Sequence, residues 1–211
     1  LVLGAEMFGA DDQLILDEYL QGLIREKNFR EEAGLWKNYS TGYRPLVLFA
    51  KENDLPFIAT NIPRRYASMV AEGGFEALEQ LSDQAREYVA PLPVDYDPDL
   101  TGYRKMLEMK HMPGMKQPDK NLPRAQAIKD ATMAYFILQN RKDEGLFLHY
   151  NGTYHSNNHE GIVWYIRQTD PDAKVGTIAT VEQEKLDQLE DKHQGLADFI
   201  LVVDSDMTKT Y

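Results

Sequence analysis

The sequence contains no cysteine, no long hydrophobic run and no excess of positive charge, and each absence excludes a class of protein. Without cysteine there is no disulfide framework, zinc–thiolate site or thiol nucleophile. No run reaches the roughly 18 apolar residues that a membrane-spanning helix needs. The chain has 23 Lys and Arg residues against 34 Asp and Glu, a net charge of −11. This charge argues against a nucleic-acid partner and against electrostatic binding to an anionic membrane.

Several catalytic motifs are also missing. No glycine-rich phosphate loop follows a predicted strand, and neither Ser68 nor Ser156 lies in a Gly-x-Ser-x-Gly sequence. His155 and His159 have the i, i+4 spacing of helical zinc ligands, but no Glu follows the first histidine as it does in zinc proteases. Nucleotide binding, serine hydrolysis and zinc-protease chemistry are therefore not indicated.

The sequence does contain alternating strand and helix patterns along its 211 residues. A hydrophobic content of 43% with 27% charged residues is typical of a folded protein, and we expect one domain over residues 1–211. We predict an α/β fold, with a mostly parallel central sheet flanked by helices. The expected strands cover residues 1–8, 56–61, 146–148, 174–180 and 199–203.

Residues 91–123 interrupt this alternation, because they hold six of the ten prolines and four of the eight methionines. We interpret them as an inserted Met/Pro-rich helical lid. Met106 and Met109 are three residues apart, which places them on one face of a short helix, with Tyr103 and His111 nearby. Such a surface suits haem, which needs an apolar slot and an axial Tyr, His or Met ligand. The alternative is that the methionines only seal the lid against the core.

Polar side chains follow three of the predicted strands. Glu6 closes the first, Arg64 and Arg65 open the helix after the second, and His149 and His155 follow the third. Because parallel strands place their carboxyl ends at one edge, we expect these groups to lie together.

This edge permits more than one chemistry. The two arginines could hold an anionic ligand by bidentate hydrogen bonds, or form an internal ion pair with Glu6 or Asp130. Glu6, His149 and His155 could instead bind a divalent metal for hydrolysis. His149, inside a strand, could also be a hydrogen-bonded core histidine.

Two local patterns predict helix starts. Asn157 with Glu160 three residues later is a possible capping box for the helix that follows. Asn61 can cap the helix that begins near Pro63.

Four motifs, in order along the chain, resemble those of the ChaN-like haem-binding lipoproteins of the Tiki superfamily. They are Glu6-Met-Phe followed by Gln13, Asn61-x-Pro-Arg64-Arg65, Gln126-x-x-x-Asp130-x-x-Met133-Ala, and Asn151-Gly-x-x-His155-Ser. The superfamily's Gly-Glu-x-His-type strand end does not occur within the sequence, which begins directly in strand-like residues. We therefore expect a processed or trimmed product.

The resemblance implies an iron-regulated protein of the bacterial cell envelope, anchored to the outer membrane by a lipid outside this chain. Such a protein binds haem for haem or iron uptake, forms a homodimer that can stack haem between its subunits, and works with an outer-membrane haem or iron receptor. A tyrosinate ligand with a nearby histidine is then expected, either Tyr103 with His111 or Tyr154 with His155. We expect binding without catalytic turnover; the alternative is a metal-dependent esterase or protease-like hydrolase.

Overall fold

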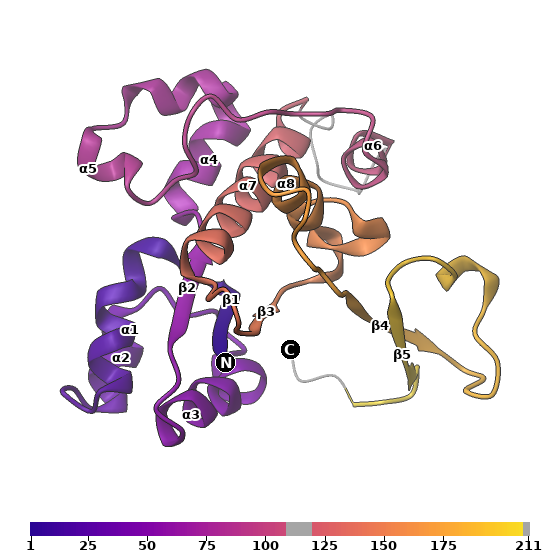
Figure 1. Cartoon of the computed structure of the whole chain (residues 1–211), viewed down its shortest axis with the longest axis horizontal. Helices are drawn as coiled ribbons and strands as arrows, with labels where there is room; N and C mark the ends of the chain where they lie inside the picture. Colours follow the sequence, from indigo (N-terminus) through magenta and orange to yellow (C-terminus); the bar gives the residue numbers. More distant parts are fainter. Residues whose placement is uncertain (109–119, 209–211) are drawn as a thin grey trace.

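A three-stranded parallel sheet, in the order β2–β1–β3, forms the centre of the fold (Figure 1). The computed structural model describes residues 1–108 and 120–208. The strands are β1 (Val2–Gly9), β2 (Phe57–Asn61) and β3 (Phe147–Tyr150). β1 is the central strand and pairs in parallel with both neighbours. This sheet, flanked by helices, confirms the predicted α/β class.

Helices cover both faces of the sheet. On one face, α1 (Gln13–Leu20), α2 (Glu26–Glu32) and α3 (Arg44–Glu52) share a hydrophobic core with β1 and β2. On the other face lie α4 (Arg64–Gly73), α7 (Leu122–Asn140) and α8 (Ile162–Thr169), with α5 (Asp83–Arg86) and α6 (Thr101–Glu108) further out (Figure 1). None of the described helices is long and apolar enough to cross a membrane.

The alternation of side chains along β1 decides which groups reach each face. Leu3, Ala5 and Met7 pack toward α1–α3, so Gly4 and Glu6 point toward α7. Gly4 is needed there, because a Cβ atom at this position would lie 2.6 Å from the ring of Phe147. The same alternation brings the Glu6 carboxylate to the helix that carries Asp130.

The outer edge of β2 is closed by a side chain. The amide nitrogen of Gln13 donates to the backbone oxygen of Phe57 at 3.0 Å, and its oxygen accepts from the backbone N–H of Ala59 at 2.7 Å. Gln13 thus replaces a neighbouring strand over these two residues, which protects the edge from pairing with another chain.

The last two strands do not extend the central sheet as predicted. β4 (Ile178–Gln183) and β5 (Phe199–Asp204) pair with each other in a separate two-stranded parallel sheet (Figure 1). Hydrophobic patterning predicts a strand but not its partner, because pairing joins residues that are distant in the sequence. Ile178, Phe199 and Leu201 remain exposed on one face of this pair.

Candidate functional site

Glu6 lies where β1 loses its regular pairing with β2. The register shifts between Ala5 and Gly9, so the pairing of β1 with β2 is irregular around Glu6. The side-chain amide of Asn61 donates to the backbone oxygen of Glu6 at 2.8 Å. The prediction that Asn61 caps the next helix is wrong, since α4 begins after Pro63 without a side-chain cap.

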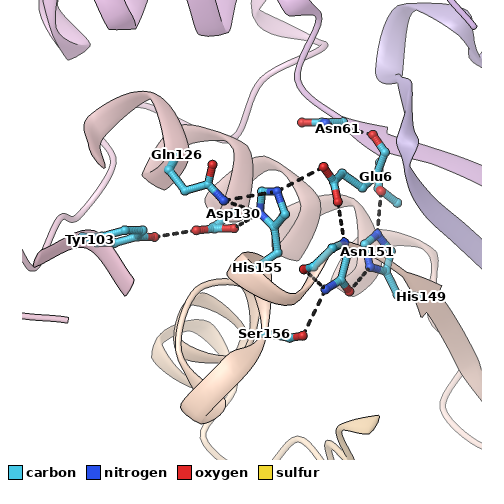
Figure 2. A network of polar contacts seen from close by, with 11 residues as sticks. Glu6, Asn61, Tyr103, Gln126, Asp130, His149, Asn151, His155 and Ser156 are labelled. Atoms are coloured by element: carbon cyan, nitrogen blue, oxygen red, sulfur yellow. Dashed lines mark hydrogen bonds and ion pairs between the residues drawn. The ribbon is translucent and has the colours of Figure 1, made fainter. Parts of the chain in front are cut away.

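Glu6, Asp130 and His155 form a buried group, called here the acid–histidine cluster, between the sheet, α7 and the turn after β3 (Figure 2). Nδ1 of His155 is hydrogen-bonded to Asp130. Its Nε2 lies 3.2 Å from Oε1 of Glu6. The side chain of Asp130 is fully buried and that of Glu6 is 11% exposed. One imidazole is thus flanked by two carboxylates, which favours its protonated form.

The members of the cluster shift one another's pKa. Burial alone would lower the pKa of His155, but the charge of Asp130 and hydrogen bonds with both carboxylates raise it to about 9. Burial would raise the pKa of Glu6, yet the hydrogen bond and charge of His155 lower it below its ordinary value. Burial raises the pKa of Asp130 despite the opposing effect of His155. The pKa of about 9 favours an imidazolium at neutral pH, held between the two carboxylates.

Three further groups attach to the cluster (Figure 2). The hydroxyl of Tyr103 donates to Oδ2 of Asp130 at 2.7 Å. The backbone N–H of Gly152 donates to Oε2 of Glu6 at 2.7 Å. The side-chain amide of Gln126 lies against the imidazole, with its nitrogen 3.0 Å from Nδ1; because Nδ1 shares its proton with Asp130, this nitrogen packs beside the ring and does not donate to it. The cluster therefore joins β1, α6, α7 and the turn after β3.

His149 has its own partners, away from the carboxylates. Its Nε2 lies 2.7 Å from the hydroxyl of Thr60, and its Nδ1 lies 3.0 Å from Oδ1 of Asn151. The amide oxygen can only accept, so Nδ1 carries the proton and Thr60 donates to Nε2. Burial lowers the pKa of His149 to about 4. This is the arrangement expected of a neutral core histidine.

The divalent-metal alternative gains no support from residues 1–108 and 120–208. Within them, no three His, Cys, Asp or Glu side chains are placed to hold a metal ion together. Of the three predicted ligands, Glu6 and His155 contact each other, while His149 is bonded to neutral groups.

Tyr154 and the two arginines reach the surface at the same edge of the sheet. Tyr154 lies in the 3-10 turn Thr153–His155 and is 58% exposed. Arg65 is held by Asp11 at 2.5 Å and lies over the ring of Tyr66. Arg64 is exposed, and its guanidinium has no ion-pair partner in the described part of the chain.

Two of the predicted lid's candidate residues point into the protein interior. Tyr103 and Met106, on α6, are 2% and 9% exposed. Burial and the charge of Asp130 raise the pKa of Tyr103, so its phenol is held in the neutral form. Met109 and His111 lie outside the described residues.

The backbone after the turn is unusual. Asn158 and His159 adopt positive φ angles of 60° and 58°, a conformation that costs energy for residues other than glycine. Gly161 has φ 56°, and a Cβ atom there would lie 2.5 Å from the backbone oxygen of His155. The predicted capping box is wrong, because α8 starts only after Gly161 and the Glu160 carboxylate accepts from the N-terminal amides of α6.

Sequence reasoning gave Asp130 as a possible arginine partner and as part of a family motif, without assigning it a contact to His155, and did not single out Thr60. The available signal for Asp130 was its position among apolar residues of a long helix, where Ile128 and Ala131 are also buried. An acid in such a position needs partners, because burying a charge alone is costly. Thr60 offered no comparable signal, since threonine is common in strands.

Replacing Tyr103 by Phe tests how α6 is attached. The variant leaves Oδ2 of the buried Asp130 without its hydroxyl donor, so we expect a loss of about 1–3 kcal/mol in the free energy of unfolding. Urea titration measures the loss. Tyr88→Phe, a partly buried tyrosine with no such hydrogen bond in the described structure, is the control. An equal effect of both substitutions would contradict this assignment.

The fold and site define an α/β protein whose sheet edge combines buried charges with one exposed tyrosine. Residues 1–166 match the family described as haem-binding uptake, Tiki superfamily, ChaN. This chain belongs to that family, which confirms the resemblance found in its motifs.

A solved structure, described as cofacial haem binding to ChaN of Campylobacter jejuni, has the same fold. The superposition has a TM-score of 0.65 and 16% sequence identity, and covers 94% of this chain and 72% of that chain. No functionally curated protein matches the chain.

Proposed function

We propose that this protein binds haem at the carboxyl edge of the β2–β1–β3 sheet, with the Tyr154 phenolate as the iron ligand. The exposure of Tyr154 carries the proposal: among the tyrosines of the described residues, it is the one that is mostly accessible, at 58%. Bound haem supplies a ferric iron, for which a tyrosinate oxygen is a known protein ligand. Membership of a haem-binding family supports the same assignment.

Arg64 is the proposed partner for a haem propionate. It begins α4 at the same edge of the sheet and has no ion-pair partner in the described structure. A guanidinium holds a carboxylate by two parallel hydrogen bonds. Arg65 is a weaker candidate, because Asp11 and the ring of Tyr66 already hold its guanidinium.

The open position of Tyr154 supports a homodimer as the binding unit. A porphyrin has two broad apolar faces, and binding is favoured when protein or a second haem covers both of them and excludes water. Two hollows of the described structure, of about 660 and 410 Å³, are not lined by Tyr154: the first lies beside Glu26 and Arg44, and the second beside Gln13 and Phe136. A second copy of the chain would supply the missing cover, and the Campylobacter structure is described as cofacial.

A role in haem uptake leads us to propose a location in the bacterial cell envelope, with a lipid anchor at the outer membrane and an outer-membrane haem or iron receptor as partner. The family description as haem-binding uptake supports this role. Fractionation of cells that express the full-length natural protein tests the location. Recovery of the protein in the cytosol would contradict it.

Titration of the purified protein with haemin tests the binding proposal. We expect a saturable Soret band with the charge-transfer absorption of a tyrosinate ligand. Tyr154→Phe should remove the charge-transfer band and weaken binding at least about tenfold, since a lost iron ligand costs more than 1.4 kcal/mol. Tyr135→Phe, a partly buried tyrosine of α7, should bind as the unchanged protein does.

Two results would contradict the proposal. One is the absence of saturable binding by the unchanged protein. The other is a charge-transfer band that persists in the Tyr154→Phe variant.

A further inference from the structure

We infer that Glu6 and Asp130 are positioning residues for haem, which fix the turn of residues 151–156 and thereby set the direction in which Tyr154 presents its phenol. The inference rests on the proposed function, because it concerns the same site. It assigns a role to two side chains that point into the protein interior. Their side chains are 11% and 0% exposed, so they act through the turn instead of touching the ligand.

Two sets of hydrogen bonds hold the turn of residues 151–156. Hydrogen bonds between residues 151–156 themselves, such as His155 N–H to the oxygen of Gly152 at 3.0 Å, close the turn but do not orient it. Asn151 is bonded to His149 at the end of β3, and the amide of Gln126 on α7 lies beside the ring of His155. The bonds of the turn to β1 and to the buried acid of α7 run from Gly152 and His155 to Glu6 and Asp130. The two carboxylates therefore hold the turn from β1 on one side and from α7 on the other.

The geometry of the turn points neighbouring side chains in different directions. Residues Thr153–His155 form a 3-10 turn, in which successive side chains point about 120° apart. His155 is 4% exposed and its neighbour Tyr154 is 58% exposed. With the imidazole fixed between two carboxylates, the backbone of the adjacent Tyr154 is fixed as well, so its Cα–Cβ bond points to the solvent side of the turn. Rotation of the turn would require both buried contacts to break.

A turn that is held in this way affects how tightly a ligand binds. Residues that orient a metal ligand without touching the metal usually change the metal affinity by about 10–100-fold. The affinity for haem would be higher when the phenol is already held outward, because the turn then loses no conformational freedom on binding. Glu6 and Asp130 supply this order from elements 124 positions apart in the sequence, Glu6 at position 6 and Asp130 at position 130.

Gly152 allows a test that changes one contact. Its φ of −68° is an angle that proline adopts. Gly152→Pro removes the N–H that donates to Glu6, whereas Gly152→Ala keeps it. A Cβ atom at this position would lie 3.4 Å from Oε2 of Glu6, an ordinary contact. We expect the proline variant to bind haemin at least about tenfold more weakly than the alanine variant, with a shifted tyrosinate charge-transfer band.

Glu6→Gln is the second arm of the experiment. It keeps the size of the side chain and an oxygen for Gly152, but removes the charge that holds His155. We expect weaker haemin binding and the same band shift as in the proline variant. Glu26→Gln is the matched control, because Glu26 pairs with Arg44 at 2.6 Å on the opposite face of the sheet, and its variant should bind haemin normally.

The band position separates positioning from general stability, since a less stable fold lowers the amount of bound haem without changing its ligand spectrum. Normal affinity and an unshifted band in both Gly152→Pro and Glu6→Gln would overturn the inference and leave the proposed function standing. Failure of the unchanged protein to bind haemin would instead overturn the proposed function itself. Equal binding by the proline and alanine variants would also overturn the inference, even if Glu6→Gln does not fold.

Discussion

Replacing Asp130 by Ala is expected to lower the free energy of unfolding by about 3–5 kcal/mol, the usual cost of removing one partner of a buried ion pair. The substitution leaves Nδ1 of His155 and the hydroxyl of Tyr103 without their acceptor. It also removes the negative charge that supports the imidazolium. Denaturant titration followed by circular dichroism measures the change.

The control for this prediction is Asp170→Ala. Asp170 also pairs with a cation, Arg141, but both side chains are 30–40% exposed at the surface. Exposed ion pairs contribute little to stability because water screens them and their side chains lose freedom on pairing. A loss below about 1 kcal/mol in the Asp130 variant would show that the cluster does not stabilise the fold as argued.

Raising the pH from 6.5 to 9 is expected to destabilise the protein. The pKa of His155 is raised to about 9 in the folded state, against an ordinary value of 6.5. The folded state therefore binds the proton more tightly than the unfolded state. This contribution is complete below pH 6.5 and is lost as the pH rises through about 9. At 1.36 kcal/mol per pKa unit, it amounts to about 3 kcal/mol.

The measurement is the free energy of unfolding in urea at several pH values, for the unchanged protein and for His155→Gln. The variant should be less stable at pH 6.5, and its stability should fall less steeply above that pH. His149 acts in the opposite window, because its pKa is lowered to about 4 and its contribution is lost as the pH falls from 6.5 toward 4. Parallel pH profiles for the two proteins would contradict the role given to His155.

Helix ends show how far local patterns can be trusted. The long helix α7 covers Leu122–Asn140 and has Pro123 in its first turn, a place that local sequence preferences favour. The capping box at Asn157 and Glu160 failed, since the Glu160 carboxylate accepts from the amides of Thr101 and Gly102 at 2.8 and 2.7 Å. A carboxylate binds the nearest free amides in space, and here these belong to a helix about 60 positions earlier in the chain.

The candidate site shows the same division. That Glu6, Arg64 and His155 reach one edge of the sheet follows from strand ends that the sequence predicts. Which of the two tyrosines, Tyr103 or Tyr154, carries the exposed phenol does not follow from the sequence. Each has a histidine nearby, because Tyr154 is next to His155 and Tyr103 precedes His111 in the predicted lid. The exposure of each tyrosine depends on which elements pack over it. The hydroxyl of Tyr103 donates to Asp130 on α7, and this hydrogen bond holds Tyr103 in the interior.

By itself, the sequence determined the α/β class, the approximate positions of β1, β2, β3 and β5, and the family, because these depend on side-chain periodicity and on motifs within a few residues of each other. The tertiary structure alone decided that β4 and β5 form their own sheet, that His155 lies between two carboxylates, and that Tyr154 faces solvent. These features join residues far apart in the chain. Their energies come from burial and from charges brought together by folding, which no local pattern specifies.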